Sequence, residues 1–176
     1  MHPGWLWSFD DTADFVVSAV ERHFPSDDPD KTVEVDVIGI SMGGLVARHA
    51  SAPDNGAQKR LNTQRMFTFA APHSGAQLAN IFGFFGTPLA MRYNSPFLKR
   101  LAEREKRTAD DDYPIIGYTR GHDLTIGAGS AIPAHLEGEL IHFPVPWYSA
   151  THLWVYRDGR LLKDMLRRLK TREPGQ

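Results

Sequence analysis

The sequence predicts an α/β fold in which a mostly parallel sheet is flanked by helices. Two observations lead to this prediction. Short apolar runs rich in β-branched residues alternate with amphipathic helical patterns, and sheets built in that order are parallel with helices on both faces. A turn of small residues, Gly39 to Gly44, also separates one such run from a helical pattern. Ligands of parallel sheets bind at the carboxyl ends of the strands, so the residues just after each strand are the most informative.

The first half of the chain predicts a helix, a strand, the glycine turn, a short helix and a second strand. Apolar residues recur at helical spacing over 11–24, behind capping residues at Asp10, Asp11 or Thr12. Valine and isoleucine predict a strand over 32–40, and Pro53 must end the short helix that follows the turn. The segment MFTFAA, residues 66–71, predicts the second strand.

The second half predicts a helical region, two further strands and a closing helix. A helical region spans about 73–113 and includes a helix whose cap is Asn94 or Ser95, with Pro96 at its first position. Further strands are expected over about 114–119 and 139–145. The buried stripe expected for the closing helix is Leu161, Leu162, Met165, Leu166 and Leu169.

Composition narrows the class of protein. The chain has 176 residues, of which 41% are hydrophobic and 23% charged, which is typical of one folded domain. Its net charge is −1 with no basic cluster, which argues against nucleic acid or an anionic membrane as a partner. It has no cysteine, so thiolate metal sites and disulfides are excluded. We expect no membrane span and, since no signal-peptide pattern opens the chain, a cytoplasmic location.

The turn from Gly39 to Gly43, GISMG, matches the pattern G-x-S-x-G between a strand and a helix. This pattern is typical of a nucleophilic serine on a strained turn at the carboxyl edge of a sheet. We expect both glycines, two positions either side of Ser41, to avoid collisions between strand and helix, and Gly44 to let the helix approach the sheet. The backbone N–H of Met42, at the helix N-terminus, is the predicted donor to an oxyanion on the substrate.

A nucleophilic serine needs a histidine as base and a carboxylate that orients it, and in this fold they follow in the order serine, acid, histidine. Asp123 follows the third predicted strand in YTRGHDLTIG and is the predicted acid. Its competitors, residues 110–112, precede that strand, at the wrong end. His152 is the predicted base, because it follows the last strand and precedes the closing helix. The alternatives that fail this test are His49, His73, His122, His135 and His142.

With these residues the chain resembles the α/β-hydrolase superfamily, in particular its lipase and serine-esterase branch. GISMGGLVAR looks like the nucleophile elbow of that branch, and TFAAPHSGA resembles the strand and turn that follow it. NSPFLKRL is similar to a short cap helix, GHDLTIG to the acid loop, and THLWVYRDGRLLKDML to the histidine loop and closing helix. The match covers about residues 5–170. It implies a triad of Ser41, Asp123 and His152, an acyl-enzyme intermediate, and no metal or organic cofactor.

The resemblance departs from the family at the front of the chain. Family members usually have strands before the first helix, including one that ends in a His-Gly loop with the second oxyanion donor. His2-Pro3-Gly4 is a poor substitute, because no apolar strand precedes it. The strand at 33–38 would then present an unpaired apolar edge, which folded proteins normally avoid. Either the chain is a fragment that lacks its N-terminal strands, or a second subunit covers the edge, or the WLWSF segment at 5–9 folds over it.

The sequence therefore predicts a single α/β-hydrolase domain over 1–176, N-terminally shortened, with a small cap-like region at about 73–113. The expected activity is hydrolysis of carboxylic esters, with an acyl ester or a lipid as substrate and a link to lipid metabolism. Apolar residues in the cap-like region are candidates for an acyl pocket as well as for ordinary core. Acyl transfer and a non-catalytic binding module with a hydrolase fold are the alternatives.

Overall fold

A computed structural model describes residues 8–75, 92–106, 113–120, 130–133, 135–136, 138–144 and 155–171. Helices and strands alternate along these residues, as predicted. The elements in order are α1 (Phe9–His23), β1 (Lys31–Ile40), α2 (Met42–Ser51), β2 (Arg60–Phe69), α4 (Pro96–Lys106), β3 (Ile115–Arg120), β4 (Gly138–Phe143), a short 3₁₀ helix η4 (Val155–Arg157) and α6 (Gly159–Lys170).

The four strands form one parallel sheet in the order β1-β2-β3-β4, which confirms the predicted fold class. Register places Ile40 of β1 beside Phe69 of β2, and Phe69 beside Tyr118 of β3. Because all the strands run the same way, their carboxyl ends meet at one edge of the sheet, where ligands of such sheets bind.

Strand β2 is longer than its apolar pattern predicts. It begins at Arg60, whereas the prediction began at residue 66, and Arg60 already pairs with Lys31 of β1. The extra residues, RLNTQR, are mostly polar because their end of the sheet is only partly buried. Pairing of the backbone with β1 extends the strand where the side-chain pattern gives no signal.

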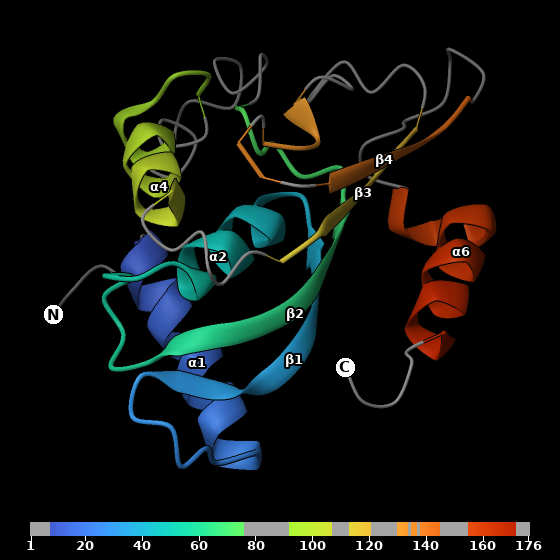
Figure 1. Ribbon diagram of the computed structural model, residues 1–176. Coiled ribbons are helices and arrows are strands. Elements are labelled where there is room, and N and C mark those ends of the chain that lie inside the picture. Colours follow the sequence, from blue (N-terminus) through green and yellow to red (C-terminus); the bar gives the residue numbers. More distant parts are fainter. Residues whose placement is uncertain are drawn as a thin grey trace, which may run out of the picture.

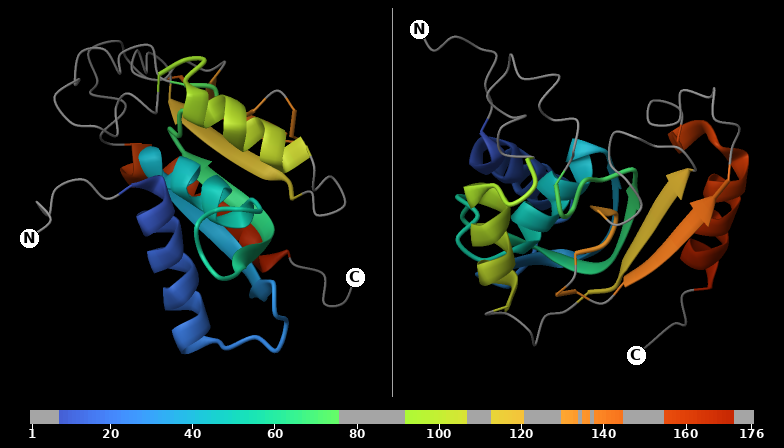
Figure 2. Two further views of the ribbon diagram at one scale, coloured as in Figure 1. Left: turned by 90° about the vertical axis from the view of Figure 1, so that its left-hand side faces the viewer. Right: turned by 90° about the horizontal axis from the view of Figure 1, so that it is seen from above.

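Helices cover both faces of the sheet, with α1 and α2 on one side and α6 on the other (Figures 1 and 2). Strand β2 serves both faces by alternation. Met66 packs in a cluster with Ala47 of α2, whereas Phe67 and Phe69 pack with Leu161 of α6. A third cluster joins residues of α1 and α2 to β1 and β2, namely Ala13, Val17, Ala50 and Leu61.

The ends of the helices follow local chemistry. Ser8 is the N-cap of α1: its hydroxyl accepts from the N–H of Asp11 at 3.0 Å, and the Asp11 carboxylate accepts from the N–H of Ser8 at 3.0 Å. The predicted caps Asp10, Asp11 and Thr12 are therefore wrong, because this reciprocal pair starts the helix earlier. In α4 the prediction is confirmed, since Ser95 Oγ accepts from the N–H of Leu98 at 3.2 Å and Pro96 opens the helix.

The predicted stripe of α6 is confirmed except at one position. Leu161 and Met165 are buried and Leu162 and Leu169 pack against the same cluster. Leu166 is 51% exposed, because five residues after Leu161 a side chain has turned away from the sheet. None of the described helices has both the length and the apolar character that crossing a bilayer demands.

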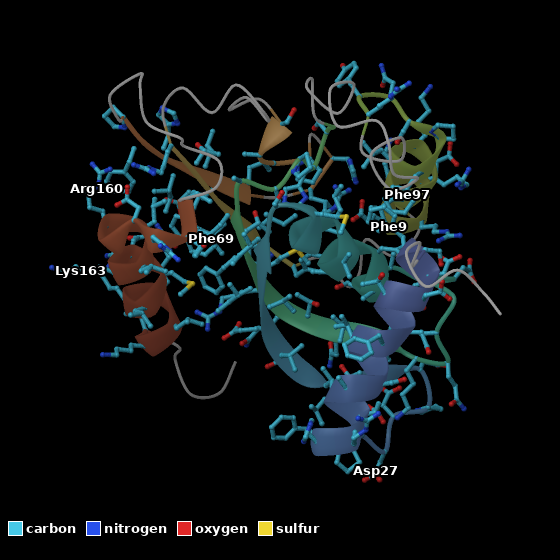
Figure 3. All side chains as sticks on the ribbon, turned by 180° about the vertical axis from the view of Figure 1, so that it is seen from behind. Phe9, Asp27, Phe69, Phe97, Arg160 and Lys163 are labelled. Carbon is cyan, nitrogen blue, oxygen red and sulfur yellow. The ribbon has the colours of Figure 1, made fainter. Side chains whose placement is uncertain are left out.

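Within the described residues β1 is an edge strand, as expected from the departure at the front of the chain. Ile38 and Ile40 alternate with the residues that face α1 and α2, and they are 51% and 47% exposed. Among the described residues, β1 thus carries exposed apolar side chains along an edge that pairs with no further strand, as the sequence predicts. Residues 1–7, which include most of the WLWSF segment, lie outside the described part of the chain. The last residue of that segment, Phe9, stacks on Phe97 of α4 at 4.0 Å between ring centroids (Figure 3).

Candidate active site

Ser41 occupies the turn between β1 and α2, at the carboxyl edge of the sheet. Its backbone has φ 51° and ψ −123°, a conformation that costs a non-glycine residue about 1–3 kcal/mol. Two hydrogen bonds hold it there, from Ser41 N–H to the carbonyl of Phe69 at 2.8 Å and from Gly44 N–H to the carbonyl of Ser41 at 3.1 Å. Although Ser41 stands at the N-cap of α2, its hydroxyl makes no capping hydrogen bond. The strained backbone of Ser41 is therefore held by backbone hydrogen bonds and not by a side-chain cap.

The glycines around Ser41 have different tasks. A Cβ at Gly39 would lie 2.7 Å from the backbone N and Cα of Gly44, and a Cβ at Gly44 would lie 2.5 Å from Cβ of Ala71. These two glycines allow the start of α2 to lie against the ends of β1 and β2, as predicted. The described residues do not support the expectation for Gly43, because a Cβ there would meet none of their heavy atoms within 4 Å.

The first turn of α2 begins at Met42, directly after the serine. The first N–H groups of a helix have no partner within it, and the helix dipole adds a partial positive charge there. The side chain of Met42 is 37% exposed. Its backbone N–H therefore lies where the predicted oxyanion donor must lie, and its role in chemistry stays a prediction.

The other two predicted triad residues, Asp123 and His152, lie outside the described residues. Asp123 follows Arg120, the last residue of β3, by three positions, and His152 precedes Val155, the first residue of η4, by three. The competing residues 110–112, His122 and the His2-Pro3-Gly4 segment also lie outside the described part.

The histidines that were weighed and set aside have structural partners. Nε2 of His49 lies 2.7 Å from Oδ1 of Asp10, and Nδ1 of His142 lies 2.9 Å from Oγ1 of Thr119. Nε2 of His135 lies 2.7 Å from Oε2 of Glu105. Burial lowers the pKa of His49, and the hydrogen bond that its ring makes to Asp10 only partly opposes this. These side chains tie elements together.

A buried charge network behind the elbow was missed by sequence reasoning. Arg48 of α2 is 1% exposed and grips Glu105 of α4 with two hydrogen bonds, Nε to Oε1 at 2.8 Å and Nη2 to Oε2 at 2.6 Å. Nη1 of Arg48 donates to the carbonyl of His73 at 3.0 Å. Burial favours the neutral acid in Glu105, but hydrogen bonds from His135 and Arg48 outweigh it and lower its pKa. The available signal was an arginine within the apolar run LVARHA.

His73 is 3% exposed and lies in the turn after β2. Burial and the charge of Arg48 place the pKa of His73 well below its usual value, so the ring is neutral. Nδ1 lies 3.4 Å from Nη1 of Arg48 and Nε2 lies 3.1 Å from Oγ1 of Thr68. Arginine only donates, so Nδ1 accepts and the proton is on Nε2. A ring held in this way is not available as a base for Ser41.

The described residues hold no group of three or more histidine or acidic side chains that is arranged to bind a metal ion. The chemistry that they offer is that of the elbow itself: a strained serine at the carboxyl edge of the sheet, with a helix N-terminus beside it. This arrangement on a parallel sheet defines the class of α/β-hydrolases.

Comparison with known proteins identifies the family. Residues 7–125 match the PGAP1-like alpha/beta domain, and because this is more than half of the chain, the protein belongs to that family. No curated protein matches the sequence at a significant level.

Solved structures share the fold. The mature form of the Bacillus licheniformis lipase BlEst2 superposes with a TM-score of 0.64 at 13% identity, covering 96% of this chain and 76% of the lipase. The product of the gene lin2722 from Listeria innocua gives 0.62 at 11% identity, with coverage of 97% and 70%. The RedJ thioesterase of Streptomyces coelicolor, from prodiginine biosynthesis, gives 0.50 at 17%, with coverage of 94% and 68%. At these identities the likeness establishes the α/β-hydrolase fold, and nothing finer.

Proposed function

We propose that the protein is a serine hydrolase of carboxylic esters in which Ser41 is the nucleophile. The observation that carries the proposal is the backbone of Ser41, which is held at φ 51° by hydrogen bonds to Phe69 and Gly44. Strain of this kind persists only where the surrounding structure enforces it, and it concentrates at functional sites. In a turn with no chemical role, glycine or asparagine at this position would adopt the positive φ at a lower conformational cost than serine.

In the proposed mechanism His152 is the base and Asp123 orients it. The Ser41 oxygen forms a bond to the ester carbonyl carbon while its proton passes to the imidazole, and the N–H of Met42 donates to the resulting oxyanion. The carbon–oxygen bond to the alcohol then breaks, and the alcohol leaves with the proton from the imidazole. Water repeats the sequence on the acyl-enzyme and regenerates Ser41.

Chain connectivity supports the two partners. Asp123 comes three positions after β3 and His152 follows β4, so both leave strands whose carboxyl ends meet at the edge that carries Ser41. Of the competing histidines, His49, His73, His135 and His142 are engaged elsewhere. One fold neighbour is a lipase and another a thioesterase, which makes acyl substrates the first class to test.

The test is hydrolysis of a short p-nitrophenyl ester together with labelling by a fluorophosphonate probe. Ser41→Ala should abolish labelling and lower turnover by at least about 1,000-fold. Ser51→Ala is the matched control, because Ser51 lies on the same helix and its hydroxyl only bonds to Ala47 and Thr63. Equal rates for wild type and Ser41→Ala would overturn the proposal and favour the non-catalytic binding module.

Two further variants test the partners. His152→Ala should be nearly as inactive as Ser41→Ala, and Asp123→Asn should lower turnover by about 10³- to 10⁴-fold because the imidazole loses its orienting charge. Unchanged turnover in Asp123→Asn would move the acid to another carboxylate while leaving the nucleophile in place. Adding an alcohol as acceptor and measuring ester formation distinguishes hydrolysis from acyl transfer.

A further inference from the structure

Arg48 is a buried guanidinium at the centre of three elements. It is 1% exposed, and within the described residues it hydrogen-bonds to other buried groups, Glu105 of α4 and His73 of the turn after β2. A charge in such a place is tolerated only because its partner is also charged and the hydrogen bonds are well formed. Loss of Glu105 would leave the arginine without its counter-charge, so the surrounding groups would have to rearrange.

The contacts of Arg48 reach the elbow through the turn at 71–75. Arg48 Nη1 donates to the carbonyl of His73, whose own ring lies against the start of α2: a Cβ on Gly44 would lie 3.4 Å from Cε1 of His73. Ala71, in the same turn, would lie 2.5 Å from that Cβ. The turn is therefore the surface against which the first residues of α2 pack, directly beside Ser41.

The end of β2, directly before this turn, also supports Ser41. Ser41 N–H donates to the carbonyl of Phe69, and the next residue, Ala70, has a positive φ of 49°. Two non-glycine residues with strained backbones thus stand at the carboxyl ends of neighbouring strands, Ser41 after β1 and Ala70 after β2. Each is kept in place by the residues that pack around it. On the side of the turn, buried Arg48 holds the carbonyl of His73.

Glu105 brings α4 into the same arrangement. Its second oxygen accepts from Arg48 and lies 2.7 Å from Nε2 of His135, so the carboxylate is held from two sides. Helix α4 touches α2 and α1 otherwise through apolar contacts, among them Leu98 and Phe97 with Leu45 and Phe9. The Glu105 carboxylate is the polar link between α4 and the turn behind the nucleophile.

We propose that Arg48 and Glu105 are positioning residues for Ser41: the ion pair fixes the turn at 71–75, and docking of α4 thereby sets the geometry of the elbow. The catalytic consequence rests on the proposed function. The structural coupling between α4 and His73 does not, and this separates the two in experiment.

The chain offers a matched control for this proposal. Arg65 and Asp36 form another bidentate pair, Nε to Oδ1 at 2.8 Å and Nη2 to Oδ2 at 2.6 Å, between β2 and β1 on the face of α6. Arg65 also donates to the backbone carbonyl of Arg168 in α6, so within the described residues this pair connects the sheet to α6 and not to the elbow. Glu105→Gln and Asp36→Asn therefore each remove one negative charge from a bidentate pair with arginine. The Glu105 pair is the more deeply buried of the two and is connected to the turn.

The first measurement is steady-state hydrolysis and the rate of fluorophosphonate labelling, at a temperature where thermal melts show every variant folded. Glu105→Gln should lower kcat and the labelling rate by about ten- to hundredfold with KM little changed, because misplacing a reacting group has costs of that size. Asp36→Asn should leave both near wild type. Arg48→Lys, which keeps the charge but loses the bidentate grip, should be impaired like Glu105→Gln. Equal kcat in Glu105→Gln and Asp36→Asn would overturn the proposal.

The second measurement does not depend on activity. In a spectrum of ¹⁵N-labelled histidine, with the His73 signal identified by its loss in His73→Gln, wild type should show a neutral ring with its proton on Nε2. Glu105→Gln should shift or broaden that signal, and Asp36→Asn should not. An unchanged His73 signal in both Glu105→Gln and Arg48→Lys would refute the coupling, even if Ser41 proved unreactive. Conversely, a shifted signal in a chain without esterase activity would sustain the coupling and reject the proposed function.

Discussion

The two faces of the sheet use the same kinds of interaction for different ends. The face of α6 is built from large apolar groups, with Phe69 and Tyr118 stacked at 4.8 Å between ring centroids and Leu161 fully buried against them. The face of α2 is built from close backbone contact, with Gly39 and Gly44 where any side chain would collide. Both faces bury apolar side chains, but only beside Ser41 does close backbone contact replace side-chain bulk. The comparison teaches that the face of α2 gives up bulk locally to hold a strained serine.

Charges differ in the same way between the faces. On the face of α2, Arg48 and Glu105 are 1% and 5% exposed. On the face of α6, Arg65 and Asp36 are each 18% exposed, and Arg168 pairs with Glu139 and Asp164 near the surface. Pairs that water reaches contribute little to folding, whereas a deeply buried pair is costly to break. The deep pair lies on the face that carries the candidate nucleophile.

The largest effect should come from the apolar face. Leu161→Ala removes a fully buried side chain and should lower the free energy of unfolding by about 2–5 kcal/mol, measured by urea denaturation. Turnover per folded molecule should stay near wild type, because the backbone of Phe69, whose carbonyl holds Ser41, keeps its place through pairing with β1 and β3. Leu166→Ala, at a position that is 51% exposed, is the control and should change stability by less than about 0.5 kcal/mol. A large loss of kcat in folded Leu161→Ala would break the distinction between the faces.

A smaller loss of stability, with a larger loss of activity, is expected from Gly39→Ala. The added methyl would meet the backbone of Gly44 at 2.7 Å, and a helix backbone cannot move aside cheaply. Overpacking of this kind costs about 1–3 kcal/mol. Denaturation curves and ester hydrolysis would be compared with Gly43→Ala, where the methyl would meet no heavy atom of the described residues within 4 Å. If Gly43→Ala were as damaging as Gly39→Ala, the steric account of the elbow would be wrong.

The glycines around Ser41 also show how much of the elbow can be predicted from the sequence alone. The strand, turn and helix around Ser41 are local in sequence, so their order, the fold class and the tight packing at Gly39 and Gly44 were predictable. The lack of such close contacts at Gly43 among the described residues was not predictable, because the crowding at each position of a turn depends on the elements packed around it. The family pattern holds a glycine there, and the pattern does not say which of its glycines is sterically required.

Arg48 and Glu105 show what could not be predicted. They are 57 positions apart, and no periodicity in either helix marks them as partners. The capping box at Ser8 was missed for a different reason, since Asp10, Asp11 and Thr12 offer equally good caps one turn later. Asp123 and His152 remain predictions from chain order, because both lie outside the described residues.

Tyr118→Phe should have a modest effect, confined to the face of α6. The Tyr118 hydroxyl donates to Oδ2 of Asp164 at 3.0 Å, and burial together with that carboxylate raises the pKa of the phenol. Removing one such bond should lower the free energy of unfolding by about 1 kcal/mol, with esterase turnover unchanged. Tyr156→Phe, at a position that is 38% exposed, should be neutral in the same urea titration. Equal effects of the two variants would mean that the buried hydrogen bond contributes nothing to stability.

The last prediction concerns the free energy of unfolding in acid. Burial alone would raise the pKa values of Glu105 and Asp164. Hydrogen bonds from His135 and Arg48 outweigh burial and lower the pKa of Glu105 below the usual carboxyl value. Hydrogen bonds from Arg167, Arg168 and Tyr118 do the same for Asp164. A carboxyl group whose pKa is lower in the folded state than in the unfolded state stabilises the fold above the unfolded pKa. That contribution is lost as pH falls through the folded pKa.

The free energy of unfolding should therefore fall steeply below about pH 4, where these carboxylates take up protons, as measured by urea denaturation from about pH 7 to about pH 3. A shallower decline should begin already below about pH 6.5, because unfolding allows the neutral rings of His49 and His73, whose pKa values are lowered in the fold, to take up protons. Glu105→Gln and Asp164→Asn should each be less stable than wild type at pH 7 and lose less stability below about pH 4, because each has one fewer group to protonate. The labelling rate of Ser41 separates the faces: at pH 7 Glu105→Gln should slow it, whereas Asp164→Asn should leave it unchanged. Slowing by both variants alike would mean that the elbow depends on the stability of the whole sheet, and that neither face has a privileged connection to Ser41.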